Sequence, residues 1–105
     1  MLDHLVLFRF LRHLGAAAID SLIDELRHLA QSTPGVSSFR VGAYDSPEGL
    51  NRGYTHGFVM TFMTEAARDA YLTHPDHLRV VDKLLPMLEG GLDGVLAFDL
   101  IHGQY

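Results

Sequence analysis

Apolar residues recur at every second position along several stretches of this chain, which is the spacing of side chains on one face of a β-strand. The clearest stretches are residues 2–10, 54–63 and 95–101. One face of the first consists of Leu2, His4, Val6, Phe8 and Phe10. One face of the second consists of Tyr54, His56, Phe58, Met60 and Phe62. The alternate positions of the first stretch are also largely apolar, so we expect both faces of the resulting sheet to be covered.

The period changes to that of an amphipathic α-helix between residues 16 and 30. The apolar side of this helix consists of Ile19, Leu22, Ile23, Leu26, Leu29 and Ala30. The sequence Thr-Pro-Gly at residues 33–35 should end the helix, because proline cannot continue its hydrogen-bonded turns. A strand is expected to follow at residues 36–44.

Two further helices are predicted in the second half of the chain. A short one should begin after Thr64, which is a suitable N-cap, and extend to Leu72. The other should run from Pro75 to about residue 88, with Pro86 kinking or ending it. The glycine-rich residues 89–94 are expected to be a flexible link to the last strand.

The predicted order is therefore β-α-β-β-α-α-β, that of a split βαβ, ferredoxin-like α+β fold. This plan places helices on one face of a four-stranded antiparallel sheet. The 105 residues suffice for one domain, so we expect residues 1–105 to form a single one. The other face would expose Leu5, Leu7, Val59 and Met63, an apolar patch that predicts a homodimer closed sheet against sheet.

The composition of the chain excludes several classes of binding partner and several kinds of chemistry. The formal charge is −5 and the eight Lys and Arg residues are scattered, so no nucleic-acid partner is expected. No apolar run approaches the roughly 20 residues that cross a bilayer, and the start of the chain does not resemble an export signal, which together predict a cytoplasmic protein without a membrane partner. The absence of cysteine excludes disulfides, thiolate nucleophiles and Cys-ligated metals. Chemistry must come from His, Tyr, Asp and Glu.

Four residues are the best candidates for such chemistry. His4 and His56 share a strand face with apolar side chains, so both imidazoles should point toward the helices. Tyr71 and His77 lie where the two later helices meet above that face. A neutral imidazole in an apolar pocket can accept a proton, and a tyrosine hydroxyl can donate to an oxygen that becomes negative. His77 should lie in the first turn of its helix, where the helix dipole lowers its pKa.

Other interpretations of these residues stay open. The sequence His-Pro-Asp-His at residues 74–77 is also a suitable helix start, because proline fits the first helical position and Asp76 favours the dipole. A single histidine on an apolar strand face, as His4 and His56 each are, is commonly a core residue that hydrogen-bonds a carbonyl or a buried water. No metal is expected, since no His-Glu-x-x-His or comparable spacing is present.

The ordered segments "HLVLFRF", "PGVSSFRVG", "DSPEGLNRGYTHGFVMTF", "YLTHPDHLRVVDKLLPML" and "AFDL" resemble the stress-responsive A/B barrel family, or Dabb, along nearly the whole chain. The resemblance implies a ferredoxin-like subunit that pairs into a dimeric α+β barrel. Functions differ among members and many are unknown. The olivetolic acid cyclases of plants belong to the family and close polyketides by an intramolecular aldol condensation without a cofactor.

The resemblance to those cyclases implies roles for individual residues. Their catalytic tyrosine and histidine match Tyr71 and His77, and their pocket histidines match His4 and His56. Aromatic residues of the cyclase pocket are replaced by Leu26, Ile23 and Val80, so the cyclase substrate does not carry over.

We therefore predict a pocket between sheet and helices that takes a small hydrophobic or aromatic molecule. His77 would be the base and Tyr71 the oxyanion donor, without a cofactor. The predicted ligand-binding residues are His4, His56, Val6, Phe8, Phe58, Leu26 and Val80. The alternative is a non-catalytic, stress-associated oligomer in which these residues are structural. A haem- or flavin-linked monooxygenase is a third possibility that no feature of the sequence requires.

Overall fold

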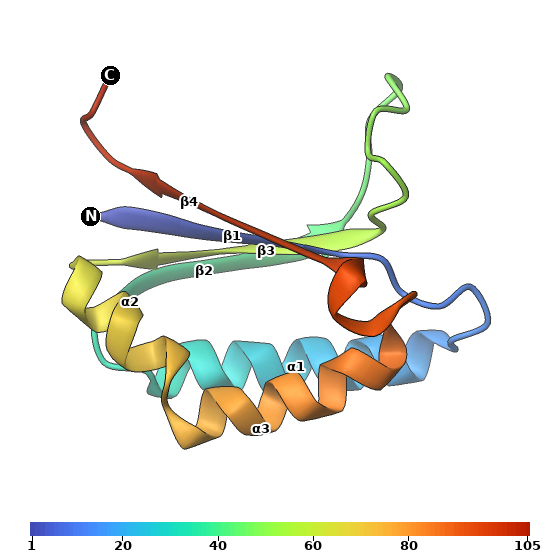
Figure 1. The fold of residues 1–105 in the computed structure, drawn as a ribbon, viewed down its shortest axis with the longest axis horizontal. Coiled ribbons are helices and arrows are strands. Elements are labelled where there is room, and N and C mark those ends of the chain that lie inside the picture. Colours follow the sequence, from blue (N-terminus) through green and yellow to red (C-terminus); the bar gives the residue numbers. More distant parts are fainter.

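The computed structural model describes residues 1–105 as a four-stranded antiparallel sheet with the helices on one side (Figure 1). The elements in chain order are β1 (Leu2–Phe8), α1 (Ala16–Ser32), β2 (Val36–Ala43), β3 (His56–Phe62), α2 (Glu65–Leu72), α3 (Pro75–Leu84), the 3₁₀ turns η1 (Leu85–Met87) and η2 (Gly91–Gly94), and β4 (Val95–Ile101). The strand order is β2-β3-β1-β4. This arrangement confirms the predicted ferredoxin-like α+β fold.

The strand register determines which inward-facing side chains are neighbours. In the central strand β1, His4 lies opposite Met60 of β3 on one side and Asp99 of β4 on the other. Phe8 lies opposite His56. Because a strand rises about 3.3 Å per residue, the His56 row is about 13 Å along the sheet from the His4 row. The two histidines therefore lie on the same face of the sheet but are not close to each other.

The starts of α2 and α3 follow the sequence prediction. The Thr64 hydroxyl caps α2 by accepting a hydrogen bond from the backbone N–H of Ala67 at 3.1 Å. His74 caps α3, its Nδ1 accepting from the backbone N–H of Asp76 at 3.0 Å, with Pro75 in the first turn. The helix-start interpretation of His74 is therefore confirmed.

The end of α3 was predicted too late in the chain. The helix stops at Leu84 and continues as the 3₁₀ turn η1 rather than reaching residue 88. Pro86 explains the difference, because its ring lacks an N–H and clashes with the carbonyl four residues earlier.

Residues 89–94 were expected to be a flexible link, but the structure holds them in place. Arg9, just after β1, donates its N–H to the carbonyl of Gly94 and accepts one from Glu89, each at 2.9 Å. Gly94 is buried, and a Cβ atom there would lie 2.6 Å from the Glu89 carbonyl oxygen. The segment is thus fixed against the end of β1, and it holds Leu92 beside the sheet edge.

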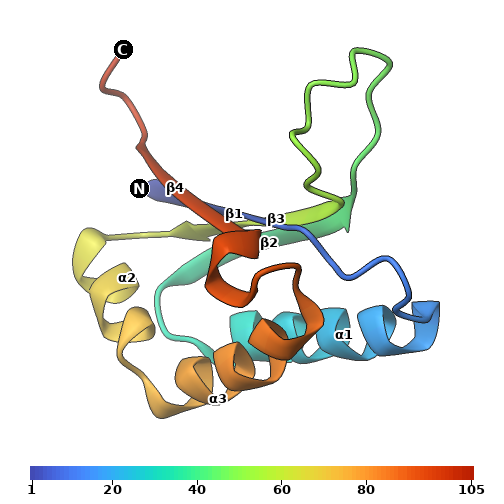
Figure 2. The same ribbon diagram turned by 45° about the vertical axis from the view of Figure 1, so that its right-hand side comes forward.

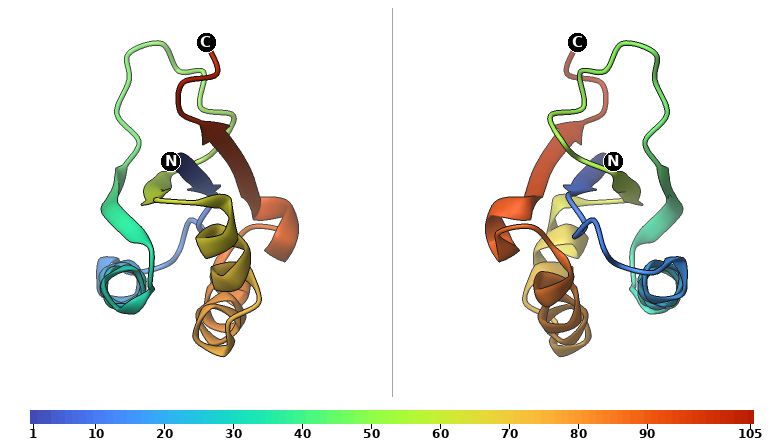
Figure 3. Two further views of the ribbon diagram at one scale, coloured as in Figure 1. Left: turned by 90° about the vertical axis from the view of Figure 1, so that its left-hand side faces the viewer. Right: turned by 90° about the vertical axis from the view of Figure 1, so that its right-hand side faces the viewer.

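The opposite face of the sheet carries no helix (Figures 2 and 3). The loop between β2 and β3 and the C-terminal residues both rise on this side, one at each end of the sheet. The face is apolar, and its most exposed members are Met63, Leu96, Phe98 and Leu100. The sequence analysis identified Met63 but not the contribution of β4. None of the helices combines the length and the apolar composition that a membrane span requires.

Candidate functional site

A cavity of about 200 Å³ lies between the sheet and the helices. Its lining consists of His4, Val6, Phe8, Leu26, Phe58, Tyr71, Leu72, His77, Val80, Val81, Leu84, Leu85, Leu92, Val95 and Ala97. We call it the inner cavity. Every residue predicted for the site lies around it except His56. Only His4, Tyr71 and His77 bring polar side-chain atoms into this apolar lining.

The inner cavity opens at the edge of the sheet formed by β4. Leu92 is 73% exposed, and Leu72 and Ala97 are also exposed, although all three line the cavity. The remaining wall residues are buried, such as Phe58 and Leu84, or half-buried, such as Val80 and Val95. The mouth is therefore an apolar rim, which favours entry of hydrophobic molecules.

His4 is held by a carboxylate from the neighbouring strand. Its Nδ1 lies 2.7 Å from Oδ1 of Asp99, and Oδ2 of Asp99 accepts a hydrogen bond from Arg68 of α2. A carboxylate can only accept, so Nδ1 of neutral His4 carries the proton and Nε2 keeps its lone pair. The bond to Asp99 raises the pKa of the Arg68 guanidinium. His4 therefore has a fixed tautomer, which leaves one nitrogen able to accept a proton or a hydrogen bond.

Asp99 and Arg68 were not predicted as part of the site. Asp99 is the only charged residue of β4, and the alternation of that strand turns it toward the helices together with Val95 and Ala97. An acidic residue on an inward strand face was a signal available in the sequence. Arg68 offered no comparable signal, because its partner lies 31 positions away.

His77 has the same tautomer by a different route. Its Nδ1 lies 3.0 Å from the backbone carbonyl of Leu72, which can only accept, so Nδ1 donates and Nε2 is unprotonated. The pKa of His77 lies below its ordinary value, as expected. The main cause is burial rather than the helix end, with His4 adding a smaller lowering effect. A neutral imidazole with a free Nε2 is the form that a general base requires.

Tyr71 lies between the two imidazoles. Its ring centroid is 4.4 Å from that of His77 and 6.0 Å from that of His4. The residue is 2% exposed, and no hydrogen bond within the chain reaches its hydroxyl. Burial raises the pKa of Tyr71, so the hydroxyl keeps its proton. The cavity thus contains an unpaired donor beside two unpaired acceptors.

His56 lies apart from this group, at the other end of the same sheet face. Its ring stacks edge-on against Phe10, with centroids 5.0 Å apart, and its Nδ1 is 2.9 Å from the Thr55 hydroxyl. Burial lowers its pKa, with Asp20 of α1 opposing the shift. The strand face was predicted correctly, but the position along the strand keeps His56 away from the inner cavity.

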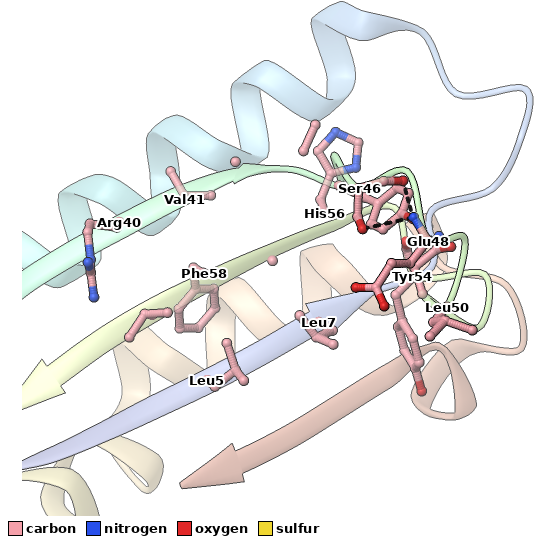
Figure 4. A pocket seen from close by; sticks show the side chains of 16 residues that line it. Leu5, Leu7, Arg40, Val41, Ser46, Glu48, Leu50, Tyr54, His56 and Phe58 are labelled. Atoms are coloured by element: carbon pink, nitrogen blue, oxygen red, sulfur yellow. Dashed lines mark hydrogen bonds between the residues drawn. The ribbon is translucent and has the colours of Figure 1, made fainter. Parts of the chain in front are cut away.

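A larger hollow of about 680 Å³ lies on the open face of the sheet, under the loop between β2 and β3 (Figure 4). Its floor includes Leu5, Leu7 and Val59, and His56 reaches it from the end of β3. The Tyr44 hydroxyl donates to the carbonyl of Ser46 at 2.8 Å and accepts from the N–H of Gly49 at 3.1 Å. This hydroxyl is thus occupied in shaping the loop.

Metal-ligating side chains do not gather anywhere in the chain. No three His, Asp or Glu residues lie close enough together to hold one ion. His4 and His77 both border the inner cavity, and the nearest carboxylate, Asp99, is already bonded to His4 and Arg68. His4, Tyr71 and His77 can transfer protons to a molecule in the inner cavity and form hydrogen bonds with it.

Comparisons with known proteins agree with the observed fold. The model of the family described as "Stress responsive A/B Barrel Domain" matches residues 2–102. A stress-response A/B barrel domain-containing protein of Arabidopsis thaliana is 30% identical over 78% of this chain and 78% of its own length.

Solved structures show the same likeness. A dimeric ferredoxin-like protein of unknown function from Jannaschia sp. is 36% identical, with a TM-score of 0.81 over 95% of this chain and 97% of its own. A hydroxynitrile lyase from Passiflora edulis has a TM-score of 0.83 over 99% of this chain and 94% of its own. At 22% identity, the likeness to the lyase concerns the fold alone.

Proposed function

Because the chain belongs to the stress-responsive A/B barrel family, in which no single activity is common to all members, we propose a function from its inner cavity. In this proposal the protein binds a small hydrophobic or aromatic carbonyl compound and transfers a proton at the carbon beside the carbonyl, without a cofactor. One observation carries the proposal: the buried Tyr71 ring, whose hydroxyl has no partner within the chain, lies between two imidazoles whose tautomers are both fixed by hydrogen bonds.

The proposed reaction begins with proton abstraction. Nε2 of His77 takes a proton from the carbon beside the carbonyl, and the electron pair of that C–H bond moves onto the carbonyl oxygen. The Tyr71 hydroxyl donates a hydrogen bond to this oxygen as it becomes negative. Nε2 of His4 accepts a hydrogen bond from a hydroxyl or enol of the substrate and so orients it.

A β-keto substrate allows a second step. The enolate carbon can attack another carbonyl of the same molecule, which forms a carbon–carbon bond and leaves an alkoxide. The alkoxide then regains the proton held by His77, and the base returns to its neutral form. This sequence is an intramolecular aldol addition, the step that forms the carbon–carbon bond when a polyketide ring closes, and its protons balance without another reactant.

The size of the inner cavity limits what can react there. A dry protein cavity of about 150 Å³ is known to hold benzene. At about 200 Å³, the inner cavity accommodates one ring with a small substituent. Leu26 and Val80 line it where an aromatic residue would take more space. The reacting part of the substrate is therefore a single ring or a chain segment of similar size.

We also propose that two copies of the chain pair through their open sheet faces. The exposed apolar side chains of that face support this assembly, as does the dimeric state of the Jannaschia relative. In such a dimer the inner cavity stays on the helix side, away from the contact. The Passiflora lyase has the same fold, which is consistent with an enzyme on this scaffold but supports no particular substrate.

The alternative function is that of a non-catalytic oligomer. One observation favours it: Asp99 joins β4 to β1 through His4 and to α2 through Arg68, a connection that could serve stability alone. In that case the polar groups of the inner cavity would be structural, and their removal would lower stability without changing any reaction.

Hydrogen–deuterium exchange tests the proposal directly. Cyclohexanone is incubated with the protein in D₂O, and loss of the protons beside the carbonyl is followed by NMR. We expect the wild type to accelerate exchange, and His77→Ala to reduce the acceleration by about 100-fold or more. Leu78→Ala is the matched control, because Leu78 is exposed on the same helix and does not line the inner cavity. Equal exchange by all three proteins would contradict the proposal and favour the structural alternative.

A further inference from the structure

A second cavity, of about 310 Å³, lies behind Tyr71. It is lined by the end of α1, the turn at residues 33–35, α2 and the start of α3, and it is open to solvent because half of its lining residues are exposed. Tyr71 is the only residue that lines both this second cavity and the inner cavity. The two cavities therefore share one side chain, the same side chain whose hydroxyl has no partner in the chain.

Small residues create the second cavity. Gly35, Ala67 and Ala70 line it where α2 approaches the turn before β2. Gly35 has a φ of +84°, and a Cβ atom there would lie 2.5 Å from Cβ of Ala67, so no larger residue fits between the two segments. The backbones meet closely at this point, while Ala70 leaves the adjoining space unfilled.

The walls of the second cavity have mixed polarity. Its apolar part includes the buried Leu29 and the exposed Pro34, and its polar rim includes His74 and Asp76. Nδ1 of His74 accepts the N–H of Asp76, so the neutral ring carries its proton on Nε2, which is free to donate. One oxygen of the Asp76 carboxylate pairs with Arg79 at 3.0 Å, and the other can accept a hydrogen bond from an uncharged donor. The rim is suited to an uncharged hydroxyl or amide.

We propose that the second cavity binds the distal end of the same ligand whose reacting part occupies the inner cavity. The ligand class is an aromatic or cyclic β-keto compound with an uncharged chain of several atoms that ends in a hydroxyl or amide. This inference rests on the proposed function. Ligand pockets typically measure about 300–1,000 Å³. The inner cavity at about 200 Å³ falls below that range, and the two cavities together fall within it.

A series of phenols tests the inference through binding alone. The phenol hydroxyl imitates the enol, and the series extends from 4-methylphenol to 4-(6-hydroxyhexyl)phenol, with affinities measured by calorimetry. Each methylene that leaves water should raise affinity about fourfold. We expect the longest phenol to bind the wild type at least about tenfold more tightly than 4-methylphenol.

Ala70→Phe should fill the second cavity and abolish this gain, while 4-methylphenol keeps its affinity. Ala70→Leu should give a smaller effect in the same direction. Ala66→Phe is the control, because Ala66 is exposed on the same helix and lines neither cavity.

The outcomes separate the two proposals. If 4-methylphenol binds but longer phenols gain nothing, or if Ala70→Phe leaves their affinity unchanged, the second cavity does not bind the ligand and the proposed function still stands. If no phenol binds the wild type at all, both the role of the second cavity and the proposed function are wrong.

Discussion

The two faces of the sheet use their polar groups differently, although both are lined largely by apolar side chains. On the helix side, Tyr71 and one nitrogen each of His4 and His77 have no hydrogen-bond partner within the chain. On the open side, Asp3 accepts from the Thr61 hydroxyl at 2.6 Å and lies 3.0 Å from Nε2 of His102. The pKa of Asp3 is lowered by these bonds, Thr61 contributing most.

This difference indicates where to look for chemistry. Unpaired polar atoms at the wall of an apolar cavity can pair with a ligand that enters it. Three of them around one apolar cavity point to a binding site. On the open face Asp3 and Thr61 are paired with each other, and Phe98 and Leu100 are exposed. The open face is better suited to contact another sheet than to hold a reactive molecule.

The largest expected effect is on the helix side and concerns Tyr71. Tyr71→Phe removes the only oxyanion donor and should lower the exchange rate of cyclohexanone about 100- to 1,000-fold. The ring remains, so the melting temperature should stay close to that of the wild type. Sedimentation is measured in parallel and should not change, since Tyr71 is buried away from the open face. A variant that exchanges normally would remove Tyr71 from the mechanism.

The next effect concerns the open face. Phe98→Glu places a charge on the proposed contact and should weaken association by about 2 kcal/mol or more, which is at least about 30-fold. Sedimentation over a range of concentrations measures the change. The matched control is Leu78→Glu on the helix side, where a charge at an equally exposed position should leave association unchanged. If the wild type is itself a monomer at micromolar concentration, the proposed dimer is wrong.

The sequence predicted the two faces well because parity along a strand determines them. His4 and His56 both point inward, as expected, and the apolar outer residues of β1, Leu5 and Leu7, are half-buried on the open side. Parity does not determine the position of a residue along the length of the sheet. That is set by pairings such as Phe8 with His56, between residues 48 positions apart, so the sequence pattern did not show that His56 lies outside the inner cavity.

The hydrogen-bond partners of the site residues could not be predicted from the sequence pattern either. Asp99 meets His4 across 95 positions, and Arg68 reaches the same carboxylate from a helix. Only the register of β1 with β4 and the docking of α2 bring them together. The second cavity likewise arises from the close approach of Gly35 and Ala67, which the spacing of apolar residues could not predict.

An effect of intermediate size on the exchange rate is expected from a change on the helix side that alters the tautomer of His4. Asp99→Asn keeps the shape of the side chain but can donate to His4 Nδ1, which would then carry its proton on Nε2. The exchange rate should fall about 10-fold or more, as for a lost outer hydrogen bond to a site histidine. Asp69→Asn is the control, because Asp69 also pairs with Arg68 but does not contact His4. An equal loss in both variants would assign the effect to Arg68 rather than to the tautomer of His4.

The smallest effect is expected for His56→Gln, which tests whether the two ends of the inner face are independent. The exchange rate should stay within about twofold of the wild type, because the His56 row lies about 13 Å from His4. The pH dependence of the melting temperature should change instead. Burial lowers the pKa of both His56 and His77 from 6.5, so the unfolded chain binds protons before the folded one as the pH falls. Their contribution is complete above pH 6.5 and is lost as the pH falls through the lowered pKa values.

The variant separates these two histidines. Between about pH 7.5 and about pH 5, the melting temperature of His56→Gln should fall less steeply than that of the wild type, because one of the two groups no longer titrates. The pH profile of exchange should be unchanged, since His77 alone must be neutral to accept the proton. A tenfold slower exchange in this variant would mean that His56 affects the reaction in the inner cavity. The two ends of the inner face would then act as one site.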